Sequence, residues 1–166
     1  MLKLTKKADY GLIALKHLAV NQARGSSSAK EIADCYGIPL PLLSKILQKL
    51  GKAGFLQSVQ GTNGGYKLAR DAREITTLEV IRSIDGPIVL TACFTEHGFC
   101  SHSDRCNVRE PLRKVHEGIL RLLSSISIAD MSADMSNAVS ETTGVEPAKL
   151  YGLAATPPTI MRNKSI

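Results

Sequence analysis

The sequence predicts a mainly α-helical fold, namely a winged helix-turn-helix with a small β-hairpin wing followed by a long dimerisation helix. Three observations lead to this prediction. Apolar residues recur at helical spacing through the first half, where Ser28 and Glu31 form a capping-box pattern. A glycine-rich hairpin pattern follows at residues 55–68, and a heptad pattern runs from residue 108 to residue 126.

Charge is distributed unevenly along the chain. Residues 1–73 contain twelve Lys and Arg against four Asp and Glu, whereas residues 74–166 contain nine against eleven. A basic half joined to a near-neutral half is typical of a nucleic-acid reader with a separate ligand or dimer module. A merely soluble basic surface is the alternative. The chain shows neither a signal-peptide pattern nor eighteen consecutive apolar residues, so we expect a cytoplasmic protein without a membrane segment.

The first two predicted helices span about residues 6–21 and 29–36. The first has one continuous apolar face. The second opens at the capping box, in which the Ser28 hydroxyl and the Glu31 carboxylate each accept a hydrogen bond from a free backbone N–H. Gly37 can adopt the left-handed conformation that ends such a helix.

The third predicted helix begins near Pro39 and Pro41 and has an apolar and a polar face. No acidic residue occurs between residues 39 and 69. A basic helix face after a tight turn suits insertion into the major groove of DNA. An ordinary solvated helix face is the alternative. The polar stripe consists of Lys45, Gln48, Lys49 and Lys52.

Two short alternating segments, residues 55–59 and 66–68, flank the glycine-rich stretch 60–65 and predict a hairpin. Such a wing lets backbone N–H groups approach a phosphate or the minor groove. Together with the basic helix, it predicts a double-stranded DNA operator as the partner. The residues that we expect to contact DNA are Ser28, Pro41, Ser44, Lys45, Gln48, Lys49, Lys52, Gln60, Gly61, Asn63 and Gly64.

The second half begins with another capping-box pattern, from Thr76 to Glu79, which opens a short helix. After the loop that follows, we expect Asn107 to cap a long helix. Glu110 would then occupy the third helical position and Pro111 the first turn.

Along this long helix, apolar residues are spaced alternately four and three apart, as in a coiled-coil seam. We therefore expect a homodimer that presents two recognition helices to a two-fold DNA site. An ordinary core helix is the alternative. Arg113, Glu117 and Arg121 form i, i+4 charge pairs on the outer face, and Ser127 is expected to start a last short helix through about residue 138. The predicted dimer interface consists of Val108, Leu112, Val115, Ile119, Leu122 and Ile126.

Cys93, Cys100 and Cys106 lie within fourteen residues, and the chain has one other cysteine, Cys35. A reducing compartment favours metal binding or redox chemistry over disulfides. Structural zinc usually takes closer C-x₂₋₄-C pairs, whereas wider spacing lets one loop surround an iron–sulfur cluster. We expect Cys35 to be buried in packing rather than to act as a ligand.

Three cysteines leave a fourth coordination position for another residue. His97 and His102 lie inside the loop, His116 lies on the long helix, and Asp9 lies at the start of the first helix. For each of them, an ordinary surface role is the alternative. Asp9 has one advantage, because a ligand from the DNA-binding half would couple the cluster to the recognition helices.

Several stretches occur together in one known pattern: LTKKADYG at residues 4–11, SAKEIA at 28–33, LSKI at 43–46, GTNGGYKL at 61–68 and GPIVLTAC at 86–93, with Cys100, Cys106, Val108 and Arg109. In these stretches the chain resembles the IscR/NsrR family of winged-helix transcription regulators. Within that family it is most similar to the branch that regulates SUF iron–sulfur assembly. The resemblance covers about residues 1–136.

The resemblance implies a homodimer with one iron–sulfur cluster per subunit, held by Cys93, Cys100 and Cys106. Arg109 stands where housekeeping-type members place a His, whereas Asp9 matches the acidic ligand of nitric-oxide-sensing members. The resemblance therefore implies Asp9, from the partner subunit, as the fourth ligand, and it keeps nitric oxide sensing open as an alternative function. A second departure is Gln60, where many members have an Arg at the wing.

We therefore expect a cluster-sensing, DNA-binding repressor of iron–sulfur assembly genes and not an enzyme. We favour a 2Fe–2S over a 4Fe–4S cluster. The alternatives are a nitric-oxide-sensing repressor, a thiol-redox enzyme, and a DNA-binding protein whose loop holds structural zinc. The expected divisions are a winged helix-turn-helix DNA-binding domain at 1–73, a cluster-binding loop and dimerisation helix at 74–136, and a disordered tail at 137–166.

Overall fold

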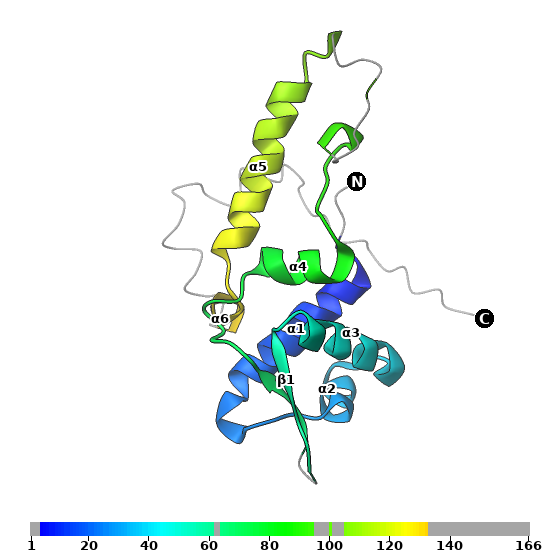
Figure 1. The fold of residues 1–166 in the computed structure, drawn as a ribbon, viewed down its shortest axis with the longest axis vertical. Helices are drawn as coiled ribbons and strands as arrows, with labels where there is room; N and C mark the ends of the chain where they lie inside the picture. Colours follow the sequence, from blue (N-terminus) through cyan, green and yellow to red (C-terminus); the bar gives the residue numbers. More distant parts are fainter. Residues whose placement is uncertain (1–3, 62–63, 95–99, 101–104, 133–166) are drawn as a thin grey trace, which may run out of the picture.

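The computed structural model describes residues 4–61, 64–94, 100 and 105–132. This part of the chain is mainly helical with one two-stranded antiparallel sheet, which confirms the predicted fold class. Figure 1 shows a body formed by the first four helices and the sheet, with α5 extending away from it. None of the described helices is long and apolar enough to cross a lipid bilayer. In chain order the elements are α1 (Lys6–Val20), η1 (Gln22–Arg24), α2 (Ala29–Tyr36), α3 (Leu40–Lys52), β1 (Leu56–Val59), β2 (Gly65–Leu68), α4 (Thr77–Asp85), η2 (Ala92–Phe94), α5 (Arg109–Ser125) and α6 (Ile128–Ser132).

The start of α1 and both ends of α2 are fixed by local hydrogen bonds and backbone geometry. At the start of α1, Ala8 N donates to Thr5 Oγ1 at 3.2 Å. At the start of α2, Glu31 N donates to Ser28 Oγ at 3.1 Å and Ser28 N donates to Glu31 Oε2 at 3.3 Å. Gly37 ends α2 in the left-handed region, with φ of 62°. The predicted capping box and stop of α2 are therefore confirmed.

The third helix, α3, follows after a short turn and has Pro41 in its first turn. Pro is tolerated there because the first N–H groups of a helix have no partner within it. The predicted apolar face is buried, apart from Leu42, which is only partly buried. The buried side chains of this face are Leu43, Ile46, Leu47 and Leu50.

The wing is joined to the segment before α2. Strands β1 and β2 pair antiparallel, with Val59 opposite Gly65. Ser27 N donates to Tyr66 O at 3.0 Å, and Tyr66 N donates to Ser27 O at 2.9 Å. A Cβ on Gly65 would lie 2.3 Å from Ser27 O, so this crossing of two backbones requires glycine. Backbone hydrogen bonds therefore hold the wing against the start of the helix-turn-helix.

One hydrophobic core runs through the described chain and crosses the domain boundary that we expected after residue 73. It joins buried side chains of α1, α2 and α3 to those of α4 and to Ile128 of α6. Ile128 N donates to Ile75 O at 2.9 Å and Ala129 N donates to Ala72 O at 3.1 Å, so the chain returns to the body after α5. The division of the chain at residue 73 stays a prediction.

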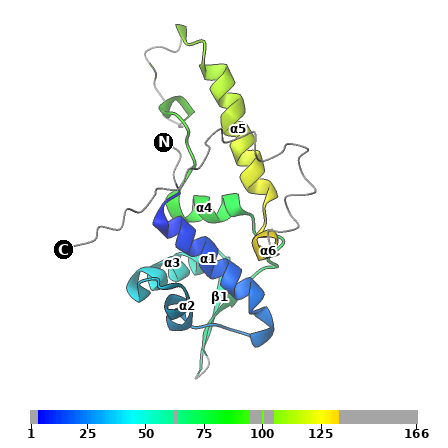
Figure 2. The same ribbon diagram turned by 180° about the vertical axis from the view of Figure 1, so that it is seen from behind.

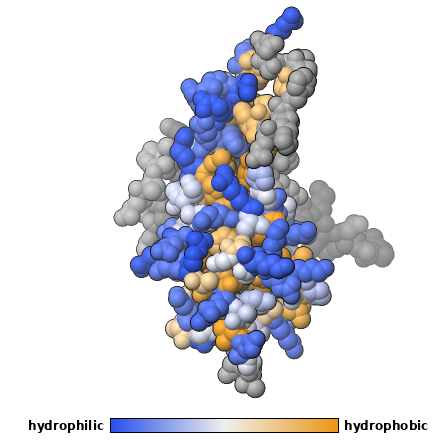
Figure 3. Space-filling view, viewed as in Figure 1, coloured by the Kyte–Doolittle hydropathy of each residue, from blue (hydrophilic) through white to orange (hydrophobic). Residues whose placement is uncertain are grey.

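By contrast, none of the residues of α5 is buried, and the helix contacts this core through the partly buried Leu123 near its C-terminal end. Figures 1 and 2 show it projecting from the body with the η2 segment alongside. At its base, Thr77 N and Thr77 Oγ1 both donate to Ile126 O, at 2.8 and 2.9 Å. In Figure 3, hydrophobic side chains in orange lie beside hydrophilic ones in blue along this projecting part.

The start of α5 differs from the prediction. The N-cap is Val108, which forms no side-chain cap hydrogen bond, so the prediction that Asn107 caps this helix is wrong. Val108 itself already has backbone angles in the helical region, with φ of −103° and ψ of −8°. Pro111 does lie in the first turn, as predicted.

The predicted burial of Cys35 is also wrong, because this side chain is exposed, whereas the prediction that Cys35 is not a ligand stays a prediction. Ile32 and Ala33 define the buried face of α2, and Cys35 falls beyond that face.

The last described helix begins as predicted. Asp130 N donates to Ser127 Oγ at 3.1 Å, and Ser127 N donates to Asp130 Oδ2 at 2.8 Å. Ser127 Oγ also donates to Asp130 Oδ2 at 2.6 Å, and this bond, together with the one from Ser127 N, lowers the pKa of Asp130. The predicted continuation to residue 138 and the tail at 137–166 lie outside the described residues.

Candidate DNA-binding face and cysteine site

The polar face of α3 points away from the core. Lys45, Gln48 and Lys52 are exposed, Pro41 is exposed at the start of the helix, and Ser44 is half-buried. Because α3 has no acidic residue, this face presents only neutral and positive groups. Its insertion into a DNA groove stays a prediction.

Lys49 differs from the other members of the predicted stripe. Its ammonium nitrogen donates to the carbonyl oxygen of Ile84 at 2.8 Å, at the C-terminal end of α4. The residue as a whole is exposed, but its charged end is directed toward α4. The structure therefore separates Lys49 from Lys45 and Lys52, although sequence spacing grouped the three together.

Glycine stands on each side of residues 62–63 at the tip of the wing. Gln60 and Gly61 are exposed, Gly64 is half-buried, and Asn63 lies outside the described residues. Gly61 has φ of 120°, and a Cβ on Gly64 would lie 2.6 Å from Val59 O. The backbone of the wing itself therefore requires glycine at both positions.

Ser28, the remaining predicted DNA contact, is half-buried. Its hydroxyl accepts the Glu31 N–H of the α2 capping box. The hydroxyl therefore has a structural role, and a contact with DNA stays a prediction.

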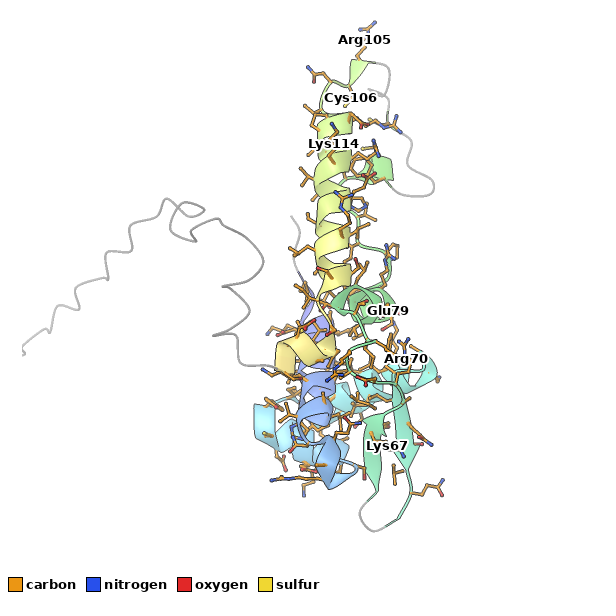
Figure 4. All side chains as sticks on the ribbon, turned by 90° about the vertical axis from the view of Figure 1, so that its left-hand side faces the viewer. Lys67, Arg70, Glu79, Arg105, Cys106 and Lys114 are labelled. Carbon is orange, nitrogen blue, oxygen red and sulfur yellow. The ribbon has the colours of Figure 1, made fainter. Side chains whose placement is uncertain are left out.

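The structure adds Lys67 to the candidate DNA-binding face. Lys67 is exposed on β2, opposite the exposed Gln57 of β1. Figure 4 shows Lys67 on the wing, at the end of the molecule opposite Cys106. Strand alternation offered a signal for it, because Tyr66 and Leu68 on either side are partly buried against the core.

The base of the wing contacts the first turn of α4. The Arg70 guanidinium lies 5.1 Å from the centroid of the Phe55 ring and 3.8 Å from Glu79 Oε1, and Figure 4 labels both Arg70 and Glu79. Thr76 N donates to Glu79 Oε2 at 3.0 Å in the α4 capping box. The backbone hydrogen bond from Thr76 lowers the pKa of Glu79, and the charge of Arg70 contributes in the same direction. The first turn of α4 therefore contacts the wing, while its last turn contacts α3 through Lys49.

The three clustered cysteines follow α4. Cys93 lies in η2, with its Sγ 2.9 Å from Thr91 Oγ1. Cys106 comes just before α5, and Figure 4 shows it at the end of α5 that is far from the body. Cys93, Cys100 and Cys106 are free thiols and half-buried.

An aromatic pair joins the η2 segment to α5. The rings of Phe94 and His116 stack with their centroids 5.3 Å apart and their planes at 21°. Nδ1 of His116 is buried and has no hydrogen-bond partner among the described residues. His116, one of the candidate ligands, therefore lies against the residue that follows Cys93.

The donors suit a thiolate-bound metal centre, because three free thiols lie on one segment. Within the described ranges, however, no group of three or more His, Cys, Asp or Glu is close enough to hold a metal ion. The residues that connect the cysteines, including His97 and His102, lie outside those ranges. Asp9 is exposed in the first turn of α1. The structure thus supplies the donors but does not bring them to one point.

The predicted seam of α5 divides into two lines of residues, each with a spacing of seven. The first line is exposed, by 54%, 51% and 59% in chain order, and consists of Val108, Val115 and Leu122. The second line is half-buried and consists of Leu112, Ile119 and Ile126. Only the first line is therefore clearly free to pack against another molecule.

A groove of about 450 Å³ lies beside this exposed line. Its walls are mostly apolar and come from α4, residues 86–89 and α5, with Leu4 and Thr5 also in its lining. The outer face of α5 is charged. Arg113 pairs with Glu110 and Glu117, and Arg121 lies 3.9 Å from Glu117, so the predicted i, i+4 pairs are confirmed.

Comparison with known proteins extends over most of the chain. Residues 4–134 match the family model described as "Rrf2: Iron-dependent Transcriptional regulator". The chain is 33% identical over 134 residues to the HTH-type transcriptional regulator NsrR of Geobacillus kaustophilus, covering 80% of this chain and 91% of that protein. It is 34% identical over 130 residues to the HTH-type transcriptional regulator IscR of Photorhabdus laumondii, covering 78% and 79% respectively.

Solved structures agree with these matches. CymR, described as the global cysteine regulator of B. subtilis, aligns with a TM-score of 0.67 and 28% identity over 80% of this chain and 97% of that chain. The IscR of T. potens aligns with a TM-score of 0.65 and 32% identity over 86% of this chain and 94% of that chain. The winged helix-turn-helix predicted from the sequence is thus confirmed, and the protein belongs to the Rrf2 family of DNA-binding transcriptional regulators.

Proposed function

We propose that the protein is a homodimeric repressor of iron–sulfur assembly genes whose DNA binding depends on an iron–sulfur cluster. The observation that carries this proposal is the set of three free, half-buried thiols located beyond α4, on a chain whose other half carries the basic helix and the wing. The family description includes iron dependence, which supports a metal-based signal. As a regulator that acts on DNA, it would work in the cytoplasm.

The residues that would hold the cluster are Cys93, Cys100 and Cys106, with Asp9 of the partner subunit as the fourth ligand. Thiolates are the usual ligands of iron–sulfur clusters. The Asp9 carboxylate is exposed on α1, so a second subunit can reach it. His116 is the alternative nitrogen donor. When bound, the cluster would supply a centre that oxidation, loss or nitrosylation can alter.

Dimerisation would use the exposed line of α5. Three apolar side chains seven residues apart, each more than half exposed, suit a helix–helix seam with a second copy of this chain. A two-fold dimer would place two copies of α3 over two half-sites of an operator. The cluster-bearing end of α5 would then belong to the same interface that sets the spacing of the recognition helices.

A second candidate function is nitric oxide sensing by the same site. Asp9 favours it, because an acidic residue at this position matches the nitric-oxide-sensing members of the family that the sequence resembles, and the side chain is exposed. Titration of the loaded protein with nitric oxide, while DNA binding is followed, separates the two functions. Release of DNA at one equivalent of nitric oxide per cluster supports this second function, and unchanged binding contradicts it.

The central test is anaerobic purification followed by iron, sulfide and zinc analysis and a visible spectrum. We expect iron and acid-labile sulfide in the wild type, with a spectrum of the 2Fe–2S type. Cys93→Ala should lose the visible absorbance, whereas the matched control Cys35→Ala should keep it, because Cys35 lies exposed on α2. Zinc without iron or sulfide would instead indicate a structural zinc site. Equal DNA affinity of the loaded and the stripped protein would contradict the sensing role.

A further inference from the structure

The C-terminal end of α4 is a junction between the DNA-binding helices and the cysteine segment. Its Ile84 carbonyl accepts the ammonium of Lys49, which belongs to the recognition helix α3, at 2.8 Å. The last carbonyls of a helix carry partial negative charge and have no partner within the helix, so a lysine is stabilised there. Lys49 therefore caps the end of α4 from another helix.

The same turn of α4 also holds α1. The side chain of Ile84 is buried, and its Cδ1 fills the space over Gly11, where a Cβ would lie 2.3 Å away. The Thr5 hydroxyl, at the start of α1, lies 2.7 and 2.8 Å from the two carboxylate oxygens of Asp85 and donates to this carboxylate. Two consecutive residues of α4 thus contact both α3 and α1.

The cysteine segment begins at the next residue. Gly86 turns the chain away from α4 with φ of 88°, while its N–H donates to Arg82 O at 3.0 Å. Seven residues further on the chain reaches Cys93. A displacement of this segment therefore acts first on the turn of α4 that Lys49 binds.

We propose that Lys49 is a positioning residue that transmits the state of the cysteine segment to the recognition helix, and that it is not a phosphate contact. This proposal rests on the proposed function. In one state of the segment the Ile84 carbonyl stays under the Lys49 ammonium and fixes the position of α3. In the other state the bond lengthens or breaks, and α3 is free to shift along the DNA groove.

The test compares Lys49→Met with Lys45→Met, an exposed lysine one turn earlier on the same helix. Met keeps most of the aliphatic stem and removes the charged donor. The probe is a short DNA duplex that the wild-type protein selects from a random-sequence pool. Two quantities are measured, namely the slope of log affinity against log salt concentration, and the ratio of the dissociation constants of the cluster-loaded and cluster-free forms.

The two variants should behave in opposite ways. A lost phosphate contact lowers the salt slope by about one. Lys45→Met should show that change and keep the wild-type ratio. Lys49→Met should keep the slope, and its ratio should fall at least fivefold toward one, since coupling between two sites typically amounts to roughly 5–150-fold. A slope lowered by about one with an unchanged ratio in Lys49→Met would overturn the proposal.

A measurement on the wild type avoids any dependence on the folding of the variants. Acylation of lysine amines, read by mass spectrometry, reports which ammonium groups are covered. DNA should protect Lys45 and Lys52. In the cluster state that binds DNA more tightly, where the Lys49–Ile84 bond is formed, the reactivity of Lys49 should be insensitive to DNA, and it should change when the protein is converted to the other cluster state. Protection of Lys49 by DNA overturns the proposal. If the cluster-loaded and cluster-free forms of the wild type bind DNA with equal dissociation constants, the proposed sensing function is overturned. The salt slope of Lys49→Met still decides whether Lys49 contacts a phosphate.

Discussion

The body and α5 use apolar side chains in opposite ways. In the body, helices α1 to α4 and Ile128 of α6 share one core in which Leu15, Leu47 and Leu50 are fully buried. In α5 no residue is buried, and Val115 and Leu122 are more than half exposed, as is Val108 just before the helix. The body therefore gains its stability from contacts within one chain, whereas α5 has an apolar surface that the rest of the described chain leaves uncovered.

The largest expected effect comes from removing a side chain of the body. Leu50→Ala should lower the free energy of unfolding by about 3 kcal/mol, because it removes buried methyl groups and leaves a cavity. Chemical denaturation at several protein concentrations measures this loss, which should be present at every concentration.

The matched variant on α5 is Leu122→Ala, at a side chain that is 59% exposed in the single chain. Its effect should appear as a raised dimer dissociation constant, measured by analytical ultracentrifugation, with little change in the unfolding of the dilute monomer. If Leu50→Ala and Leu122→Ala lowered the free energy of unfolding equally at every protein concentration, α5 would be part of the core of a single chain.

Substitution of one glycine in the body and one in α5 compares the same two regions, with a smaller expected effect on stability. Gly65→Ala should cost roughly 1–3 kcal/mol, since the new Cβ meets backbone that cannot move freely. It should also weaken DNA binding, because the wing would separate from Ser27. Thermal unfolding and a DNA titration measure the two losses.

The control is Gly118→Ala in α5, where a Cβ would meet nothing within 4 Å. It should be neutral or stabilising by up to ~1 kcal/mol, because alanine favours helix over glycine. A strong loss at Gly118 would place this residue in a tight dimer contact, and a neutral Gly65→Ala would contradict the close crossing of β2 with Ser27.

The smallest expected effect is a pH dependence within the body. The pKa of Glu79 is lowered in the folded protein by hydrogen bonding from Thr76, so its carboxylate adds stability above the ordinary glutamate pKa. That contribution is lost as the pH falls through the lowered folded value. Glu79→Gln keeps a capping acceptor but does not titrate, so its stability relative to wild type should improve as the solution is acidified.

The side chain of Glu79 is 45% exposed, so solvent screening limits the effect. We expect a difference of ~0.3 kcal/mol between neutral and acidic solution, read from urea midpoints. Addition of salt should reduce the part that comes from Arg70. A pH profile of Glu79→Gln parallel to that of the wild type would rule out this contribution.

Local patterns predicted most of the body. The Ser28–Glu31 and Thr76–Glu79 capping boxes, the left-handed Gly37 and the buried face of α3 were readable because each depends on residues within a few positions of one another. The cap of α5 was wrong for a related reason. Asn107 and Val108 both lie near the helix start, and residue type alone favoured Asn107, whereas the helix begins after Val108.

Contacts between distant segments were not readable from the sequence. Helix periodicity placed Lys49 with the DNA stripe, but the carbonyl of Ile84, a residue of another helix, draws its ammonium away. The edge pairing of Ser27 with Tyr66 likewise depends on the fold. In the cysteine site, the types of donor were predictable, whereas the positions of the three thiols relative to one another depend on the whole fold of this segment, which no local pattern specifies.

The hydrogen bonds between Thr77 and Ile126 have a consequence for the architecture of the chain. The chain leaves α4 at Gly86, after the last turn, and returns at Ile126 to the first turn, and this nine-residue helix is about 13 Å long. The segment between Gly86 and Ile126 can thus be replaced by another sequence, provided that Ile128 and α6 are retained. A linker of about five extended residues is long enough to connect the two ends of α4, so a different domain can be inserted there while the helix-turn-helix and the wing are kept.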